Sequence, residues 1–99
     1  MVVLNILFKN QARVLDITSY LKENAYALET FVDVNKLVVG KEEKVYVRIF
    51  FLTKSLLFES ICKDLLKQFP LEKLKIYSSP VTQIESAYWE QLKKKLKPV

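Results

Sequence analysis

Histidine is absent from this chain of 99 residues, and glycine and cysteine each occur only once. Without histidine there is no imidazole to activate a nucleophile, and no zinc site that combines Cys with His. One glycine cannot build the glycine-rich loops that hold phosphate groups. The lone Cys62 excludes a disulfide within the chain. Most familiar catalytic sites are therefore excluded, although carboxylate and lysine chemistry stay possible.

Long apolar runs are also missing. The longest lie within residues 2–8 and 49–52, far short of the roughly 20 residues that a membrane-spanning helix needs. The N-terminus lacks a basic segment and a small-residue cleavage site, so we expect no signal peptide. With 51% hydrophobic residues and no linker-like segment, residues 1–99 are expected to form a single soluble, intracellular domain.

The positive charge of the chain is carried almost entirely by lysine. The formal net charge is +5, and Arg13 and Arg48 are the only arginines. Proteins that recognise nucleic acids usually rely on arginine for paired contacts. A surface rich in Lys and Glu is typical of thermophilic proteins, so we favour a thermostable protein.

The spacing of apolar residues predicts alternating strands and helices. The expected elements are strand 2–8, helix 12–25, strand 26–34, strand 44–52, helix 55–69, strand 73–77 and helix 79–97. This order, βαββαβα, predicts an α+β fold with an antiparallel or mixed sheet, on the ferredoxin-like plan plus a C-terminal helix. A strand over residues 12–17, in place of the first helix, is the alternative that would change this topology.

Several polar residues stand where helices are expected to begin. Serine, threonine, aspartate and asparagine accept hydrogen bonds from the first free N–H groups of a helix. The candidates are Asn10 or Asp16 for the first helix, Thr53 or Ser55 for the second, and Ser79 before Pro80 for the third, with Thr82 and Glu85 as an alternative capping box. Gly40 marks the only glycine-based turn, between the second and third strands.

Acidic residues offer little for a metal site. Asp16, Asp33 and Asp64 are the only aspartates, and Glu42-Glu43 is the only acidic pair. Their spacing does not resemble a known ligand loop, so we interpret them as a cap, a strand end, a solvated helix face and a turn. Cys62 lies on the apolar stripe of its helix and is interpreted as core filler. We therefore expect no catalytic residue, no cofactor and no metal.

The third strand carries two distinct faces. Tyr46, Arg48 and Phe50 alternate with the apolar residues on the other side. Aromatic residues beside an arginine can stack on single-stranded RNA, but the glycines of the RNP1 pattern are absent. We favour a face covered by the final helix or by another subunit, because a bare apolar face is adhesive. Tyr46, Phe50 and Trp89 are accordingly the candidate interface residues.

The C-terminal helix ends in a basic cluster of Lys93, Lys94, Lys95 and Lys97. Such clusters bind phosphate backbones in a salt-dependent way, whereas the helix dipole alone also favours lysine at this end. Nucleic-acid binding through these lysines, with help from Arg48, is the alternative function.

As a whole, the chain resembles the small orphan proteins of filamentous viruses of hyperthermophilic archaea, the lipothrixviruses and rudiviruses. The resemblance rests on the start Met1-Val2-Val3-Leu4-Asn5 and on a composition rich in Lys, Leu, Val and Tyr, without His and nearly without Gly. It implies heat and acid tolerance, a location in the host cytoplasm or the virion, and no assigned activity. We therefore expect a non-enzymatic interaction module, a homodimer that binds a host or viral protein.

Overall fold

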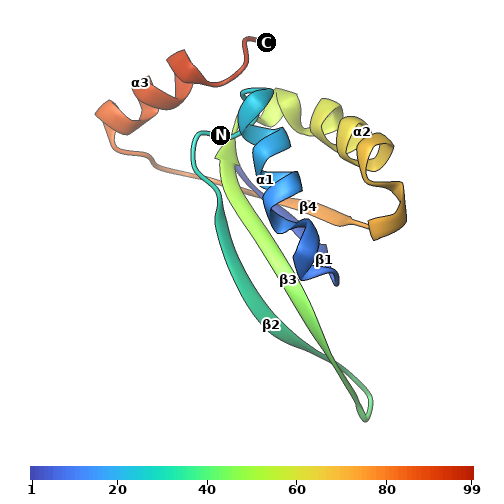
Figure 1. The fold of residues 1–99 in the computed structure, drawn as a ribbon. Helices are drawn as coiled ribbons and strands as arrows, with labels where there is room; N and C mark the ends of the chain where they lie inside the picture. Colours follow the sequence, from blue (N-terminus) through green and yellow to red (C-terminus); the bar gives the residue numbers. More distant parts are fainter.

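The computed structural model describes residues 1–99 as one sheet with three helices (Figure 1). Short 3-10 turns (η) flank α1 and α2. The elements are β1 (Val2–Phe8), η1 (Gln11–Arg13), α1 (Val14–Glu23), β2 (Phe31–Val39), β3 (Glu42–Thr53), η2 (Ser55–Leu57), α2 (Phe58–Gln68), η3 (Pro70–Glu72), β4 (Lys75–Pro80) and α3 (Ser86–Lys95). The order βαββαβα and the α+β class are confirmed. No helix is both long and apolar enough to span a bilayer.

The sheet has the strand order β2-β3-β1-β4, and each neighbouring pair is antiparallel. Ile6 of β1 lies opposite Ile49 of β3 and Ile76 of β4. This is the ferredoxin-like arrangement that the element order predicts. β2 and β4 are the two edge strands of this sheet.

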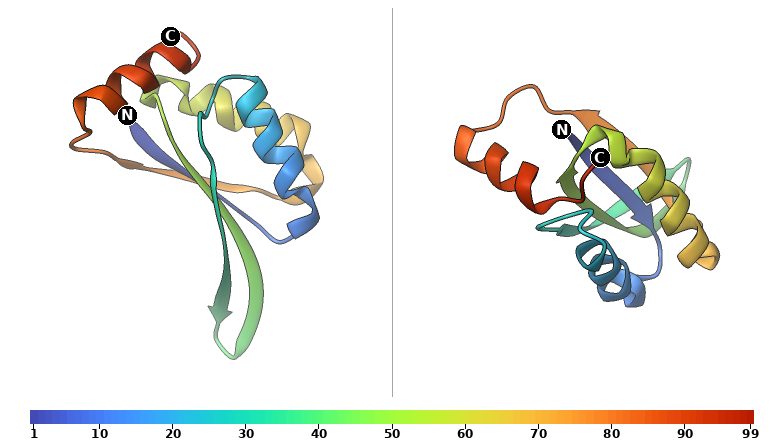
Figure 2. Two further views of the ribbon diagram at one scale, coloured as in Figure 1. Left: turned by 60° about the vertical axis from the view of Figure 1, so that its left-hand side comes forward. Right: turned by 90° about the horizontal axis from the view of Figure 1, so that it is seen from above.

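The core lies between the sheet and one layer of helices, α1 and α2 (Figures 1 and 2). Alternate residues of the two central strands point into it, because side chains of a strand alternate between faces. The central members of this core are Leu4, Ile6 and Phe8 of β1, Val47, Ile49 and Phe51 of β3, Ile17 and Leu21 of α1, and Ile61 and Leu65 of α2. The opposite face of the sheet has neither α1 nor α2 on it.

The β2–β3 hairpin extends well beyond the helices (Figures 1 and 2). Its turn uses Gly40 with φ of +61°, a left-handed conformation that glycine adopts without steric cost. The molecule measures 45 × 27 × 20 Å, and its radius of gyration is 14.1 Å. A compact domain of this length has a radius of gyration of about 13 Å, so the hairpin makes the molecule elongated.

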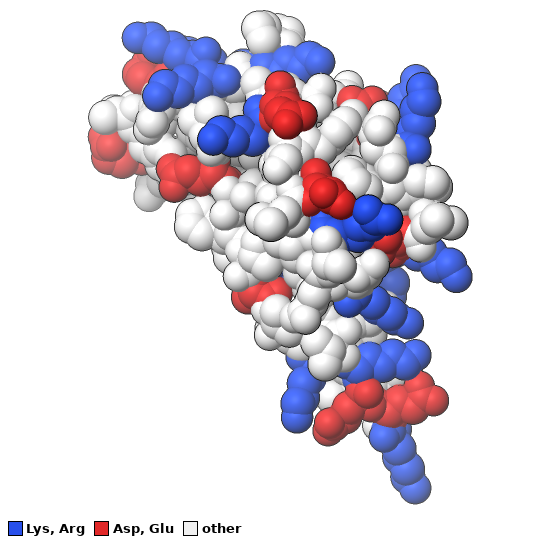
Figure 3. Space-filling view, in the orientation of Figure 1, with Lys and Arg blue, Asp and Glu red and all other residues white.

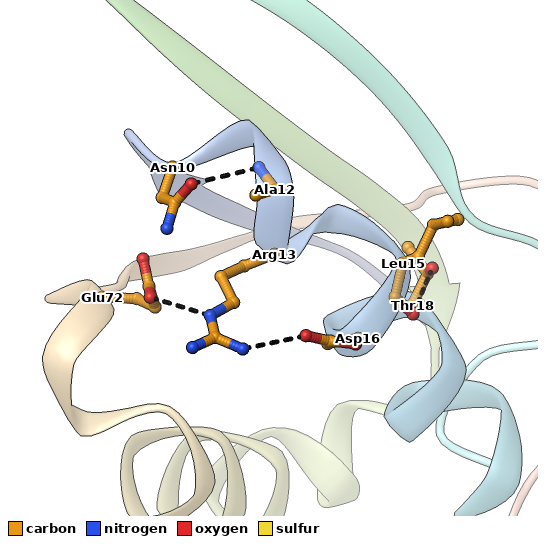
Figure 4. Close-up of polar contacts among 7 residues, drawn as sticks. All are labelled: Asn10, Ala12, Arg13, Leu15, Asp16, Thr18 and Glu72. Carbon is orange, nitrogen blue, oxygen red and sulfur yellow. Dashed lines mark hydrogen bonds and ion pairs between the residues drawn. The ribbon is translucent and has the colours of Figure 1, made fainter.

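The first helix forms as expected, and the alternative strand over residues 12–17 is wrong. Asn10 is the cap: its Oδ1 accepts a hydrogen bond of 3.1 Å from the N–H of Ala12 (Figure 4). Asp16 lies in the first turn of α1 instead.

The second strand begins later than expected, at Phe31 rather than residue 26. After α1, Ala25 adopts a left-handed conformation with φ of +55°. The N–H of Tyr26 then donates to the carbonyl of Leu21, and the N–H of Ala25 donates to that of Lys22. This is a Schellman motif, in which an alanine occupies the position usually held by glycine. It turns Tyr26 into the core and delays the strand.

The expected caps of the second and third helices are wrong. Thr53 is the buried end of β3, and neither it nor Ser55 caps a helix with its side chain. Ser79 and Pro80 end β4, where a proline is tolerated because the strand lies at the sheet edge. Glu85 itself caps α3, since its carboxylate accepts hydrogen bonds from the N–H groups of Ala87 and Tyr88.

Candidate functional site

The face of the sheet that lies opposite α1 and α2, called the open face below, carries an aromatic pair. Phe31 of β2 and Phe50 of β3 are register partners, and their rings stack with centroids 5.4 Å apart. The guanidinium of Arg48 lies 4.2 Å from the centroid of the Phe50 ring. Phe31 keeps 49% of its surface exposed and Tyr77 of β4 keeps 47%. A sizeable apolar surface therefore stays uncovered within one chain.

Arg48 is held on the open face by Asp33, its register partner on β2. Its Nη2 lies 2.7 Å from Oδ2 of Asp33, and its Nε lies 3.3 Å from Oδ1. The hydrogen bonds from Arg48 lower the pKa of the Asp33 carboxyl below its ordinary value. This paired contact fixes the guanidinium against Phe50, so Arg48 is engaged within its own sheet.

The outer part of the hairpin, residues 34–45, is called the hairpin arm below. It carries apolar residues that no helix covers, although they lie on the helix side of the ladder. Val34, Val38 and Val45 are between 52% and 61% exposed. β2 is also an edge strand, with one row of backbone N–H and C=O groups unpaired. An exposed edge of this kind can pair with another strand.

The three candidate interface residues do not lie together. Tyr46 and Phe50 lie on the open face, whereas Trp89 lies on α3 in a shallow pocket of about 280 Å³ beside Met1, Leu56 and Val99. Trp89 and Tyr46 therefore lie near opposite ends of β1. The pocket of Trp89 includes Met1, which precedes this strand, whereas the pocket beside Tyr46 includes Phe8, which ends it. Residues that sequence reasoning missed are Phe31, Asp33 and the valines of the arm. Apolar alternation through residues 31–39 was the available signal for them.

The lysines of the C-terminal helix do not form one surface with Arg48. Figure 3 shows positive side chains gathered over α3, at the upper left of the view, away from the hairpin. Lys93 pairs with Glu90 at 3.5 Å, and the ammonium of Lys97 lies 5.3 Å from the centroid of the Tyr26 ring. Lys93, Lys94 and Lys95 occupy the last turn of α3, where the helix dipole favours positive charge.

The aspartates are each engaged by another side chain. Asp16 pairs with Arg13 at 3.0 Å, and the same guanidinium donates to Glu72 at 3.2 Å (Figure 4). Asp33 holds Arg48, and Asp64 accepts a hydrogen bond from Tyr26. No group of three or more His, Cys, Asp or Glu side chains is placed to hold a metal ion. The donors of one chain therefore do not fit a resident metal.

Tyr26 links three elements of the core. Its hydroxyl donates to Asp64 of α2, and its carbonyl accepts a hydrogen bond of 2.8 Å from the hydroxyl of Thr53 at the end of β3. Burial, and then the hydrogen bond to Asp64, raise the pKa of Tyr26 to about 12. Because the protonated form is favoured in the folded protein, its contribution to stability is complete below the ordinary value of 10.0 and is lost as the pH rises toward about 12.

Alkaline titration followed by tyrosinate absorbance is expected to show a component that ionises near pH 12 and is absent from the Tyr26→Phe variant. The Tyr77→Phe variant is the matched control, because Tyr77 lies on the open face and is half exposed. A titration curve that loses no late component on replacement of Tyr26 would contradict the hydrogen bond between Tyr26 and Asp64.

Cys62 is half-buried on α2 rather than part of the central core. Burial raises the pKa of the Cys62 thiol, and the nearby Glu59 carboxylate adds to the shift. Because the thiolate is the reactive form, we expect iodoacetamide to modify Cys62 more slowly at pH 7 than it modifies free cysteine. Mass spectrometry over time measures this rate. Modification as fast as that of free cysteine would contradict the raised pKa of Cys62, and faster modification would mark the thiol as an activated nucleophile.

Comparison with family models gives no match, and no curated protein matches by sequence. Solved structures do match over nearly the whole chain. CutA1 from Pyrococcus horikoshii has a TM-score of 0.85 at 17% identity, and the match covers 99% of this chain and 100% of that one. CutA from Synechococcus elongatus, complexed with Bis-Tris, has a TM-score of 0.85 at 12% identity, with coverage of 96% and 92%. The divalent cation tolerance protein Cut A1 from Thermus thermophilus has a TM-score of 0.80 at 16% identity, with coverage of 98% and 100%.

These matches correct two expectations. The resemblance to orphan proteins of filamentous viruses is wrong, because the matching structures are CutA1 proteins of cellular organisms. The host-cell interaction module and its alternative, nucleic-acid binding, are wrong for the same reason, and the engaged Arg48 and dispersed lysines do not indicate a nucleic-acid surface. At these low identities the likeness concerns the fold: this chain has the ferredoxin-like α+β fold of the CutA1 proteins.

Proposed function

We propose that the protein acts as a homo-oligomer assembled through the hairpin arm and the open face. The arm carries the argument, because its exposed valines and the unpaired edge of β2 lie outside the core of a single chain. A second copy of the chain is the occupant that we infer. Two copies of one edge strand can pair with each other. Lys36 of β2 already pairs with Glu43 of β3 in the same chain, so the charge of this lysine is balanced before the edges meet.

The open face supports the same assembly. Phe31 and Phe50 form an apolar stack there with neither α1 nor α2 above it. Burying apolar surface of this kind contributes about 25 cal/mol per Å², so covering it favours association. The smallest closed assembly is a two-fold homodimer, and higher rings use the same surfaces in a head-to-tail manner.

We further propose that the assembled protein serves tolerance of divalent cations, without being an enzyme. The support is the fold shared along the full length with CutA1 proteins, one of which is described as a divalent cation tolerance protein. The proposal of a non-catalytic role is supported by the lack of histidine, which removes the commonest general base. One chain has no three metal-ligating side chains close together, so we propose that side chains from more than one chain would bind a divalent cation.

A growth assay tests this role. Cells that produce the protein are expected to grow at higher Cu²⁺ or Zn²⁺ concentrations than cells with an empty vector. Cells that produce a Val45→Asp variant, designed not to assemble, are expected to lose this advantage, while those with Leu15→Asp keep it because Leu15 is exposed on α1. Equal growth of the producing and empty-vector cells across the cation series would contradict the proposal.

A further inference from the structure

We propose that a pocket at the end of β1 binds a small phosphate-bearing anion. The pocket has a volume of about 370 Å³, within the range of roughly 300–1,000 Å³ that small-molecule sites occupy. Its polar lining consists of Lys9, Asn10, Tyr46, Glu72, Lys73 and Lys75. All of these residues belong to one chain, so the inference goes beyond the proposed assembly. Tyr46 is part of the open face, so the inference requires that the assembly leave the end of this face beside Phe8 accessible.

Two ammonium groups converge on one aromatic ring in this pocket. The Nζ atoms of Lys9 and Lys75 lie 5.8 and 5.6 Å from the centroid of the Tyr46 ring. Lys9 follows β1, Lys75 begins β4 and Tyr46 belongs to β3, so three separate segments bring these groups together. Attraction to the ring faces holds the ammonium groups over the pocket instead of in open solvent.

The three lysines of the pocket have no ion-pair partner. No carboxylate lies within ion-pair distance of Lys9, Lys73 or Lys75. Glu72 is the only acidic residue in the lining, and its Oε1 already accepts a hydrogen bond of 3.2 Å from Nε of Arg13 (Figure 4). Like charges held near one another repel, and an anion placed among the lysines removes that repulsion.

The backbone places Lys73 at this pocket through an unusual conformation. Its φ of +49° and ψ of +53° lie in the left-handed region, which lysine rarely adopts. Glycine would adopt this turn without steric cost, yet the position carries a third ammonium group. The left-handed residue ends the 3-10 turn η3 and directs the chain into β4 beside the pocket.

The donor chemistry selects phosphate over carboxylate. Lysine binds phosphate as a compact point charge with three rotatable donors, whereas planar carboxylates are matched best by the fork of arginine. The one arginine beside the pocket, Arg13, is engaged by Glu72 and Asp16. Asn10 uses its Oδ1 to cap the helix turn, which leaves its amide N–H groups as further donors.

Calorimetric titration with pyrophosphate, at constant ionic strength and without divalent cations, tests the pocket. We expect saturable binding with one pyrophosphate per chain, weakened about tenfold by Lys9→Gln and by Lys75→Gln, which corresponds to about 1.4 kcal/mol per lost contact. Lys63→Gln and Lys67→Gln are matched controls, because both lysines are exposed on α2 outside the pocket lining. These variants should bind pyrophosphate like the original protein.

Three results would overturn the inference. They are no heat of binding at millimolar pyrophosphate, equal weakening by the control variants, or citrate binding as tightly as pyrophosphate. Measuring the mass of the same samples separates this pocket from the proposed assembly. A monomer that binds pyrophosphate refutes only the assembly, and an oligomer that does not bind it refutes only the pocket.

Discussion

Replacing Phe51 with alanine is expected to lower the free energy of unfolding by about 3–5 kcal/mol. Phe51 is 1% exposed and packs in the core between β3 and the helices. Its removal loses apolar burial and leaves a cavity that the surrounding strands and helices fill only in part. Each kcal/mol lowers the melting temperature of a domain of this size by about 4–8 °C, so thermal and urea unfolding both detect the change.

The neighbouring Phe50→Ala variant is the matched control. Phe50 lies on the open face, where it contacts Phe31 and Arg48. Aromatic stacking and a partly exposed cation–π contact are each worth about 1 kcal/mol, so in the monomeric Val45→Asp background this variant should lose much less stability than Phe51→Ala. Equal losses from the two variants in that background would mean that both faces of β3 are equally packed within one chain, which contradicts the one-sided core.

Replacing Val45 with aspartate is expected to dissociate the protein into monomers. Val45 is 55% exposed in one chain, so we expect the substitution to leave the core intact. Its register partner on β2 is Lys36, which can pair with the new carboxylate and maintain the hairpin. In an assembly this carboxylate would be desolvated at a cost of several kcal/mol, which weakens association roughly a hundredfold or more.

Light scattering after gel filtration measures this dissociation, with Leu15→Asp as the control. Leu15 is 77% exposed on α1, away from the arm, so the same change of charge should leave the mass unaltered. Dissociation by both variants would indicate a general effect of charge, and dissociation by neither would exclude the arm from the interface.

The sequence predicted the fold because its strongest periodic segments are also its core elements. Residues 44–52 alternate apolar residues at the strand period, and these residues lie in β3 with Val47, Ile49 and Phe51 buried. The helical spacing of residues 57–69 likewise coincides with α2 and its buried Ile61 and Leu65. Where the apolar residues of a segment are also its core residues, their spacing alone distinguishes a strand from a helix.

The boundaries that were missed depend on tertiary contacts. Tyr26 belongs to an alternating pattern that is typical of a strand. In the structure it lies outside the sheet, because its hydroxyl and its carbonyl form hydrogen bonds with Asp64 and Thr53, which are distant in sequence. Alanine replaces the glycine that would have marked this helix end. Ser79 and Pro80 have the chemistry of a helix start, but pairing of β4 with β1 extends the strand through them.

The candidate site was predicted only in part. The shared face of Tyr46, Arg48 and Phe50 follows directly from strand alternation. The residues of β2 that contact this face cannot be predicted from alternation. The register of β2 against β3 decides that Phe31 lies opposite Phe50 and Asp33 opposite Arg48. The lysine pocket beside Tyr46 could not be predicted from local sequence patterns either. Lys9 lies far in sequence from Lys73 and Lys75, and the pairing of β1 with β4 brings them together.

Sedimentation equilibrium of the unmodified protein, over a wide concentration range, tests most directly whether the exposed hairpin arm is a contact between copies of the chain. Assembly through this arm predicts a single species whose mass is two or more whole multiples of 11.6 kDa. A mass of 11.6 kDa at every concentration would contradict it.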